Sequence, residues 1–500
     1  MERDVTKRKR NKQEYARATT LETLESRLLY SFTFTSLAAF KGKNAGIQPM
    51  SLVVDADGNL FGTTARGGAK KYGTIFEIPA GTTDILTLAS FTGKNGIYPT
   101  GSLVLDSDGV LWGTTTSGGS LNRGTIFSFI TGSTASTITT VFNFNGTGGS
   151  YPQMGLVTDS AGDFYGTTLG SEHGKNASIL FKLSSDGSTL TRLATFDPKS
   201  LASGGLVVDS SGNIFGTTTK GGTKKVGTVF EFPAGATGST VTTLASFTGS
   251  NGTLPTTALL IDDDGNLIGT TGGGGTHSEG TLFRFNVTAN TITTLASFRG
   301  SNGDRPVGNI VADSSGNYFG VTTLGGSKDR GVIFEYVAGN TTSTITSLYS
   351  FRGGITGRNP AGALVIDAND NLFGTTYLGG HDDDGTVFEL APGGAAEPTP
   401  SVAAFATQAQ GFLQVGTHAD SGQTGVEPQS NDLKCGSALV MTDPVGADAS
   451  VLNVGPAHCE LTLGKNSDVI SLVGLNPMVP LTFTLQTAPA DASAGILHLL

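Results

Sequence analysis

Short apolar runs, each ended by glycine, aspartate or proline, recur along most of the chain. In residues 51–91 these runs fall at 51–55, 59–64, 74–78 and 84–91, and the last of them alternates apolar and polar positions. Runs of this length between turn residues are typical of β-strands. The unit therefore predicts four short antiparallel strands.

The second run, N-L-F-G-T-T at residues 59–64, returns in close copies six more times. Seven units of about fifty residues, each with four strands, predict an all-β fold, a seven-bladed β-propeller of four-stranded blades. The glycine of each copy is Gly62, Gly113, Gly166, Gly216, Gly269, Gly320 or Gly374.

The seventh unit lacks a fourth strand, because residues 362–390 hold three apolar runs and continue into Pro392-Gly393-Gly394. Residues 33–40, T-F-T-S-L-A-A-F, are similar to the fourth strand T-I-T-T-L-A-S-F at 291–298. A ring needs its first and last blades joined, and an uncovered edge strand invites unwanted pairing. We therefore expect the propeller to span residues 33–392 and to be closed by an N-terminal strand in the last blade.

A large apolar residue precedes the repeated glycine in every copy. We expect it to pack between blades, while the glycine lets the neighbouring sheet approach closely. Both then build the blades and take no part in chemistry. The apolar residues are Phe61, Trp112, Tyr165, Phe215, Ile268, Phe319 and Phe373.

Both ends of the chain differ from the repeats. Residues 1–32 are polar, carry a basic run at 7–10 and are predicted to be a disordered or targeting segment. The basic run is either an arm that touches an anionic polymer or a solvated tail. Residues 393–430 are rich in Ala, Pro, Gly, Thr and Gln and predict a linker. Short apolar runs within residues 431–500 predict a small β-rich module of unknown role.

Composition agrees with an all-β protein, since only 14% of residues are charged and 73 are glycine. A formal net charge of −10 and a pI near 5.1 argue against nucleic acid as a partner. The two cysteines, Cys435 and Cys459, lie outside the repeats and either form one bridge or remain separate thiols. No run of eighteen apolar residues occurs, so we expect no transmembrane segment, and the first thirty residues lack the apolar core of a secretory signal.

Charge is unevenly divided between the two sides of the predicted ring. The loops after each second strand and after each fourth strand should emerge on one face, and together they hold eighteen Lys and Arg against eight Asp and Glu. The opposite turns hold acids and neither Lys nor Arg. Such polarity steers an anionic polymer to one face, whereas the alternative is a set of solvated loops that charge keeps soluble. The candidate ligand-binding residues are Arg66, Lys70, Lys71, Arg123, Lys220, Lys224, Lys225, Arg299, Arg305, Lys328, Arg330, Arg352 and Arg358, and further cations of these loops are Lys41, Lys43, Lys94, Lys175 and Lys199.

One aspartate per unit opens a D-x-x-G-N-like turn, in which the carboxylate can accept hydrogen bonds from amides two residues on. Calcium loops are the alternative, but the further ligands of an EF-hand are missing. The aspartates are Asp55, Asp106, Asp159, Asp209, Asp262, Asp313 and Asp367.

Three histidines occupy the same loop of units three, five and seven, and each has an acidic neighbour. They could ligate a metal ion if the loops bent toward the ring axis. Because glycines neighbour all three histidines and alternate blades are far apart, we expect no metal site. We also expect no cofactor and no catalytic residue. The residues concerned are His173, His277, His381, Glu172, Glu279 and Asp382.

The unit F-G-T-T-x-x-G-G-x-x-x-x-G-T-I-F-E at residues 61–77, repeated with Val for Ile at 215–231, resembles the bacterial GloVer tandem repeat. The resemblance covers residues 33–392 and departs locally, for example where Ser178-Ile179-Leu180 replaces G-T-I. It implies a surface or exported repeat protein with no assigned activity. Residues 24–31, L-E-S-R-L-L-Y-S, resemble the L-E-x-R-x-L-L-S segment of many surface and exported proteins of planctomycete-type bacteria, which implies an extracellular or cell-surface location.

These patterns predict a monomeric, non-catalytic binding or scaffold propeller whose partner is an anionic polysaccharide or a surface protein. The alternative is a propeller-type lyase or glycosidase, which needs paired carboxylates, or a histidine and an acid, at the mouth of the channel. The first strands, at residues 52–54 and 206–208, offer that channel apolar residues and no such group. The sequence thus favours binding over catalysis.

Overall fold

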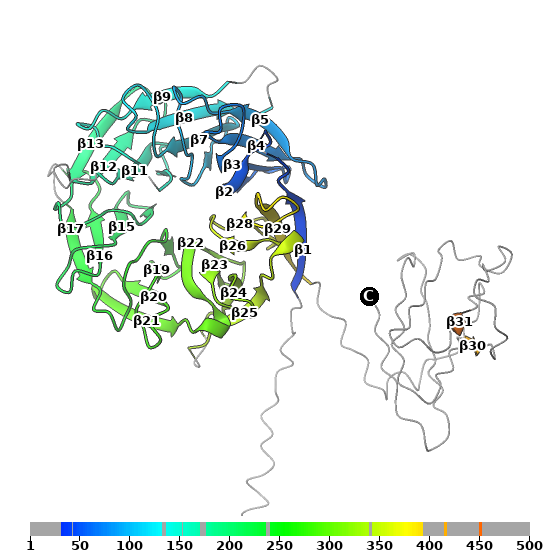
Figure 1. Cartoon of the computed structure of the whole chain (residues 1–500). Helices are drawn as coiled ribbons and strands as arrows, with labels where there is room; N and C mark the ends of the chain where they lie inside the picture. The colour runs from blue at the N-terminus through cyan, green and yellow to red at the C-terminus, as the bar shows by residue number, and fades with distance from the viewer. Residues whose placement is uncertain are drawn as a thin grey trace, which may run out of the picture. The chain divides into compact units, whose positions relative to one another are not determined.

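Seven antiparallel β-sheets follow one another around a ring in chain order (Figure 1). The computed structural model describes residues 32–393, with gaps at 43, 133–136, 153, 171–176, 237–240 and 340–342, together with residues 415–417 and 450–452. Over these ranges the strands are accompanied only by two short 3₁₀ turns, η1 (Gly300–Asn302) and η2 (Gly354–Thr356). The predicted all-β, seven-bladed propeller is confirmed.

Strands within a blade pair in chain order. Blade one holds β2 (Ile47–Val54), β3 (Leu60–Arg66), β4 (Thr74–Ile78) and β5 (Leu86–Ser90). Blade two holds β6 (Val104–Leu105), β7 (Val110–Thr115), β8 (Thr125–Ile130) and β9 (Thr139–Asn143), and blade three holds β10 (Val157–Thr158), β11 (Phe164–Thr168), β12 (Ile179–Leu183) and β13 (Leu190–Thr195). Blade four holds β14 (Leu206–Val208), β15 (Ile214–Thr218), β16 (Thr228–Phe232) and β17 (Thr242–Ser246).

The remaining blades repeat this plan. Blade five holds β18 (Leu260–Ile261), β19 (Leu267–Thr271), β20 (Thr281–Asn286) and β21 (Thr291–Ser297), and blade six holds β22 (Asp304–Ala312), β23 (Tyr318–Leu324), β24 (Val332–Tyr336) and β25 (Thr346–Ser350). In blade seven, β26 (Arg358–Pro360) and β27 (Val365–Ile366) both pair with β28 (Leu372–Leu378), which pairs with β29 (Thr386–Pro392).

The outer strand of blade seven comes from the start of the propeller. β1 (Phe32–Ala39) pairs antiparallel with β29, from Phe32 opposite Pro392 to Ala39 opposite Thr386 (Figure 1). The Phe34 ring stacks on Tyr349 of blade six with centroids 3.6 Å apart. The predicted closure by an N-terminal strand is therefore confirmed.

Phenylalanine pairs join each blade to the next. The residue that follows the outer strand of one blade contacts, within 4.9–5.4 Å between ring centroids, a phenylalanine in the third strand of the following blade. All of these rings are buried. Because the first pair links β1 to blade one, the same contact also closes the ring. The pairs are Phe40–Phe76, Phe91–Phe127, Phe144–Phe181, Phe196–Phe230, Phe247–Phe283, Phe298–Phe334 and Phe351–Phe388.

The repeated glycine makes room for a ring of its own blade. A Cβ at Gly62 would lie 2.4 Å from Cζ of Phe76 and 2.5 Å from the Ser51 carbonyl oxygen. Phe76 is the cross-strand partner of Gly62. The expectation that this glycine admits the neighbouring sheet is therefore wrong, because the space above it is filled from within the same sheet. The apolar residue before the glycine is buried in all seven blades, as predicted.

Of residues 394–500 the structure describes one two-stranded antiparallel sheet, β30 (Val415–Thr417) with β31 (Ser450–Leu452). β30 falls within the predicted linker 393–430 and β31 within the predicted module 431–500. The remainder of these two segments, the N-terminal segment before residue 32, and both cysteines lie outside the described residues.

Candidate binding face and central cavity

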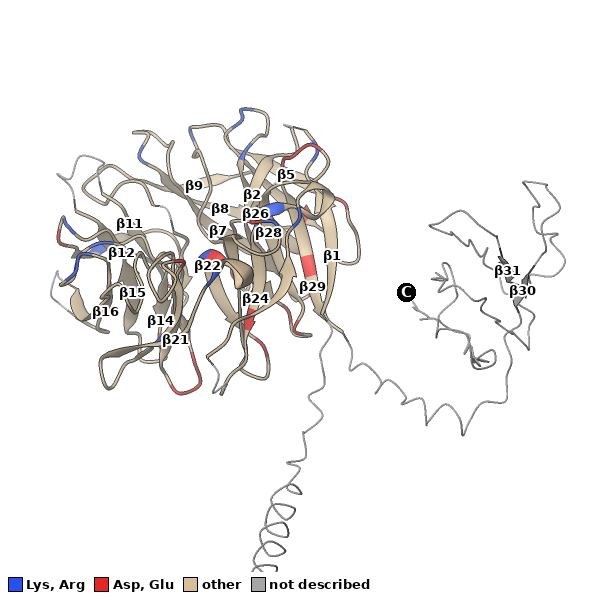
Figure 2. Ribbon diagram, turned by 60° about the horizontal axis from the view of Figure 1, so that its bottom comes forward, with Lys and Arg blue, Asp and Glu red and all other residues tan. Residues whose placement is uncertain are grey.

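Two sets of loops leave each blade at the same edge. In blade one, the start of β2 lies opposite the end of β3 (Ile47 with Arg66), and the start of β4 lies opposite the end of β5 (Thr74 with Ser90). The loop after strand two and the loop into the next blade therefore emerge together, on the side that we call the loop face. Most Lys and Arg lie in these loops, together with fewer acids such as Asp304, Asp329 and Asp382, whereas the opposite turns carry acids and neither Lys nor Arg (Figure 2).

The candidate cations are spread around this face rather than gathered at one point. Arg358 forms two hydrogen bonds to Asp383, at 2.7 Å (Nη2–Oδ2) and 3.3 Å (Nε–Oδ1). The Arg358 guanidinium beside it lowers the pKa of Asp383. Arg123 and Arg330 donate to the backbone carbonyls of Asn145 and Arg352. Eight more are exposed and have no salt bridge to another described residue: Lys70, Lys71, Lys220, Lys224, Lys225, Arg299, Lys328 and Arg352.

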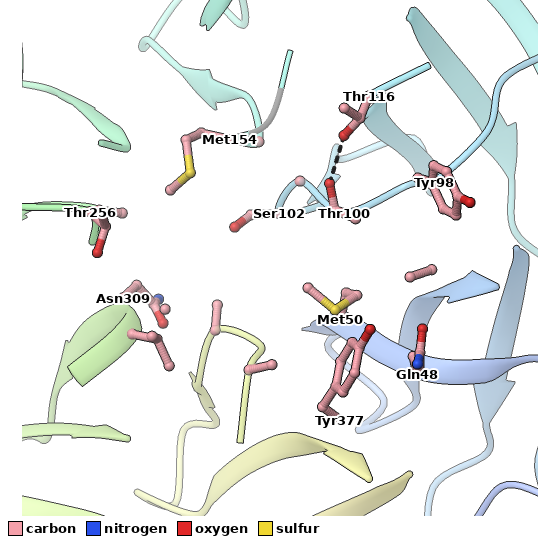
Figure 3. Close-up of a pocket in the computed structure, with 18 of the residues that line it drawn as sticks. Gln48, Met50, Tyr98, Thr100, Ser102, Thr116, Met154, Thr256, Asn309 and Tyr377 are labelled. Atoms are coloured by element: carbon pink, nitrogen blue, oxygen red, sulfur yellow. Dashed lines mark hydrogen bonds between the residues drawn. The ribbon is translucent and has the colours of Figure 1, made fainter. Parts of the chain in front are cut away.

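The seven first strands converge at the ring axis, where a central cavity of about 540 Å³ opens on the loop face (Figure 3). Its lining comes from every blade except blade four. Small or short side chains predominate at the lining position directly before the buried leucine or isoleucine of each first strand, which leaves the space open. These residues are Ser102, Gly155, Ala258, Asn309 and Ala363.

Residues 52–54 do not face the axis, contrary to the expectation from sequence. Leu52 and Val54 pack in the core between blades seven and one, and Val53 packs in the core between blades one and two. Strand side chains stand perpendicular to their sheet, so in a propeller they point at the neighbouring blades. The cavity is lined instead by residues that precede these positions, such as Met50 and Ser102, and by residues at the ends of second strands, such as Arg66 and Tyr377.

The cavity combines aromatic, polar and cationic groups. Tyr98 and Tyr377 line it together with Met50 and Met154 (Figure 3). The Arg66 guanidinium lies 5.5 Å from the centroid of the Tyr98 ring, and it is the one charged side chain among the described lining residues. Arg66 is thus the candidate cation placed at the centre of the face.

Two amide side chains of the cavity have unused acceptors. Gln48 Oε1 and Asn309 Oδ1 are buried and have no hydrogen-bond partner. A buried polar atom without a partner costs about 1–3 kcal/mol. The pair of Thr100 and Thr116 hydroxyls, 2.9 Å apart, adds further hydrogen-bonding groups. The two hydroxyls can bond a ligand in the cavity, whereas the two amide oxygens have almost no accessible surface in this structure.

An inter-blade clamp fixes two of these side chains. Gln48 and Tyr98 have left-handed backbones, with φ of 61° and 58°, and each precedes a proline. The Tyr98 N–H donates to the Tyr72 carbonyl of the previous blade at 3.2 Å, and the Gln48 N–H does the same to Asp384 at 2.8 Å. The same conformation recurs before the proline of four other blades, at Tyr151, Leu254, Arg305 and Asn359, so it is part of the blade plan and sets the direction of whichever side chain stands there.

Sequence reasoning missed the uncharged part of this cavity, namely Gln48, Met50, Tyr98, Met154, Asn309 and Tyr377. A signal was present in the comparison of the copies. The residue before the proline varies, and so does the residue after T-T, which is Ala65 in blade one and Tyr377 in blade seven. Variable positions beside fixed ones are where a repeat protein can place its ligand contacts.

The seven repeated aspartates hold their turns, as predicted. Asp55 Oδ1 accepts the N–H groups of Asp57 (3.0 Å) and Asn59 (2.8 Å), and Oδ2 accepts Nδ2 of Asn59 at 2.8 Å. Blades two and three have no asparagine at the position of Asn59, and an aromatic side chain donates the hydrogen bond to the aspartate instead. Trp112 Nε1 donates to Asp106 at 2.7 Å, and the Tyr165 hydroxyl donates to Asp159 at 2.8 Å. Both carboxylate oxygens are thus used by protein donors.

Within the described ranges no three His, Cys, Asp or Glu side chains gather as a metal site would require. His381 Nδ1 lies 2.6 Å from Asp382 Oδ1, while His173 and Glu172 fall outside the described residues. No carboxylate or histidine is among the described residues that line the cavity. The helices of the described chain include none with the length and apolar content to cross a membrane.

The fold defines a tandem-repeat β-propeller with a cavity at the ring axis. The chain belongs to the Gloeobacter/Verrucomicrobia repeat family, whose model matches residues 25–204 and 202–426. This confirms the repeat type predicted from residues 61–77. Among curated proteins, none matches the sequence.

Solved structures resemble this chain at low sequence identity. The chain is 14% identical to a catalytically inactive variant of virginiamycin B lyase from Staphylococcus aureus, with a TM-score of 0.48 and coverage of 72% of this chain and 99% of that one. It is 12% identical to the extracellular domain of BT4673 from B. thetaiotaomicron, with a TM-score of 0.46. That match covers 68% of this chain but only 38% of the BT4673 chain. Neither likeness bears on what the present chain binds.

Proposed function

We propose that this propeller is a non-catalytic binding or scaffold protein of the bacterial cell surface that holds an anionic polysaccharide on its loop face. The observation that carries the proposal is a ring of exposed cations without carboxylate partners among the described residues, around a cavity that Arg66 and two tyrosines line. Tyrosine faces and amide groups suit sugar rings and hydroxyls, and the cations suit carboxylate or sulfate groups.

Many weak contacts support such binding better than one strong one. A single exposed ion pair contributes about 0–1 kcal/mol, so useful affinity requires a ligand that reaches several loops at once. A polymer meets this condition, whereas a small anion does not. Because exposed charges are screened within about 10 Å at 0.1 M salt, the affinity should fall steeply as salt is added.

The location rests on the sequence. The segment at residues 24–31 resembles one found in exported proteins, and it lies outside the described residues. Secretion would give the loop face access to the polysaccharides that surround bacteria.

Glycan-array profiling at low and high salt tests this function, combined with a screen for hydrolase and lyase activity. We expect retention of uronate-rich or sulfated glycans at low salt, loss at high salt, and no cleavage. Turnover of any polysaccharide that is insensitive to salt would replace the proposal with an enzyme. If only neutral glycans are retained, the cations of the loop face do not contribute to binding.

A further inference from the structure

A second hollow adjoins the central cavity between blades five and six. Its volume is about 870 Å³, and it is lined by Leu254, Arg305 and the glycine run Gly272–Gly273–Gly274–Gly275 among others. Thr256 and Val307 line both this groove and the central cavity. The two hollows therefore lie next to each other, and the second is lined from blades five and six.

Blade five keeps this groove open by lacking a side chain. The residue after T-T is Gly272 in blade five, but Ala65, Thr116, Leu169, Thr219, Thr323 and Tyr377 in the other blades. A Cβ at Gly272 would meet nothing closer than the Leu254 carbonyl oxygen at 3.5 Å. Neither backbone conformation nor packing requires glycine there, since Gly272 is absent from the left-handed positions. Its effect is to leave the groove unobstructed.

The groove has the chemistry of a continuation of the same site. Arg305 is exposed within it and has the same strained, proline-preceding backbone as Tyr98, with φ of 56°. Leu254, 48% exposed, offers an apolar surface, and Ser250, Thr253 and Ser278 offer hydroxyl groups. The acids beside Arg305, Asp304 and Glu279, are not among the lining residues.

We propose that the groove is the exit path of an extended anionic polysaccharide whose end occupies the central cavity, a proposal that rests on the proposed function. The terminal sugar unit lies against Tyr98 and Tyr377 near Arg66. The following units pass over Gly272 and Gly273, and one of their acidic groups meets Arg305. The site thus recognises a chain end together with several adjoining units.

Size-fractionated galacturonate oligomers and dextran sulfate test the path, with titration calorimetry on the full chain. For the wild type we expect affinity to rise with oligomer length until the groove is filled. Gly272→Tyr introduces the residue that blade seven has at this position. It should lower the affinity for long oligomers at least about tenfold and leave the affinity for the shortest binding oligomers unchanged. Arg305→Gln should also lower the affinity for long oligomers.

Thr323→Tyr is the matched control, because it makes the same side chain at the equivalent position of blade six, which lines neither hollow. If Gly272→Tyr lowers the melting temperature, Gly272→Thr repeats the test with the residue of blades two, four and six. If the wild type, both Gly272 variants and the control bind long oligomers with equal affinity, the groove is not the exit path. The proposed function is then unaffected. Failure of the wild type to bind an oligomer of any length instead overturns the proposed function.

Discussion

At the scale of single residues, the threonine two positions after the repeated glycine ties two strands together beneath the loop face in every blade except blade three. Thr115 Oγ1 lies 2.8 Å from Thr125 Oγ1, and it also accepts the Thr125 N–H at 3.1 Å. Five blades contain such a hydroxyl pair. In blade three Ile179 takes the place of the partner, and the buried Thr168 Oγ1 has no hydrogen bond. The departure of Ser178-Ile179-Leu180 from the repeat therefore has a local cost.

This difference gives opposite outcomes for the same substitution. Thr115→Val should destabilise the protein by about 1–3 kcal/mol, because it leaves Thr125 short of a buried partner. Thr168→Val should be neutral or stabilising, because it removes a hydroxyl that is buried without a partner. Urea unfolding of both variants measures the two free energies. Equal destabilisation would contradict the assignment of Thr168 as unpaired.

Three glutamates of the third strands lie close to the acidic turns. Burial, followed by the charge of Asp313, raises the pKa of Glu335 above its usual 4.5, and Glu77 and Glu389 behave likewise beside Asp55 and Asp367. Blades three and five place Lys182 and Arg284 at this position, where they form ion pairs with turn aspartates. The turns therefore favour a cation here and disfavour an anion.

Glu335→Gln should raise the melting temperature at pH 7. A raised pKa means that the folded state binds the proton more tightly than the unfolded state, so stability is lost as the pH rises from 4.5 through the folded pKa. The stability difference between variant and wild type should therefore grow across this pH range and be small below it. Thermal unfolding of both proteins from pH 4 to pH 8 checks the sign. A constant difference would show that packing alone is responsible.

At the scale of elements, β1 is the part on which the ring depends. It pairs along β29 and contributes Phe34, which stacks on blade six, while Phe40 just beyond it is buried against Phe76 of blade one. One short strand thus connects three blades. Without it, β29 would expose an unpaired edge, and edges of this kind associate with other chains.

Deletion of residues 1–40 should lower the free energy of unfolding by more than about 3–5 kcal/mol, the cost of truncating one buried phenylalanine. Size-exclusion chromatography should show dimers or larger species formed through β29. Deletion of residues 1–31, which stops before β1, is the control and should leave the melting temperature unchanged. A monomer of unaltered melting temperature after the longer deletion would contradict the closing role of β1.

At the scale of the whole molecule, Lys and Arg outnumber Asp and Glu in the loops of the loop face, while the opposite turns carry acids and neither Lys nor Arg (Figure 2). The chain nevertheless has a net charge of −10. Attraction of a polyanion therefore depends on which side it meets, since long-range fields steer ligands by local rather than by total charge. Exposed lysines contribute to this field without being needed for the fold.

Replacing Lys70, Lys220, Lys224 and Lys328 together with glutamine should slow association with dextran sulfate and weaken its salt dependence. All four are exposed, so the melting temperature should not change. The control replaces the exposed turn residues Asp57, Asp108 and Asp263 with asparagine, which should leave association unchanged or speed it slightly. Biolayer interferometry at two salt concentrations compares the variants. If the association rate falls equally in the lysine variant and in the aspartate control, attraction by the loop face alone is refuted.

The fold could be predicted because its signals are local and repeated. Apolar runs between turn residues specify strands, and the fifty-residue period of Gly62 and its copies specifies blades. The missing fourth strand of the last unit and the similarity of residues 33–40 to such strands specified the closure. The function of the repeated aspartates followed in the same way, because an Asp turn is complete within five residues.

The cavity could not be predicted, because its lining joins residues far apart in the chain. Gln48, Tyr98 and Tyr377 belong to three blades, and nothing near them in sequence shows that their side chains share one space. The error over residues 52–54 has the same origin, since the direction of a strand relative to the ring axis is a property of the assembled sheets. Of the predicted cations, the structure puts Arg66 in the cavity and Arg305 in the groove, and it pairs Arg358 with Asp383.

The sequence by itself determined the strands, the seven blades, the strand that closes the ring and the side on which the cations emerge. All of these follow from hydrophobic periodicity and turn chemistry within about fifty residues. Only the tertiary structure decided which side chains meet at the axis, which cations remain unpaired and that Gly272 lines a groove beside the central cavity. These depend on distances between blades, and the distances are set by the packing of whole sheets around the hub.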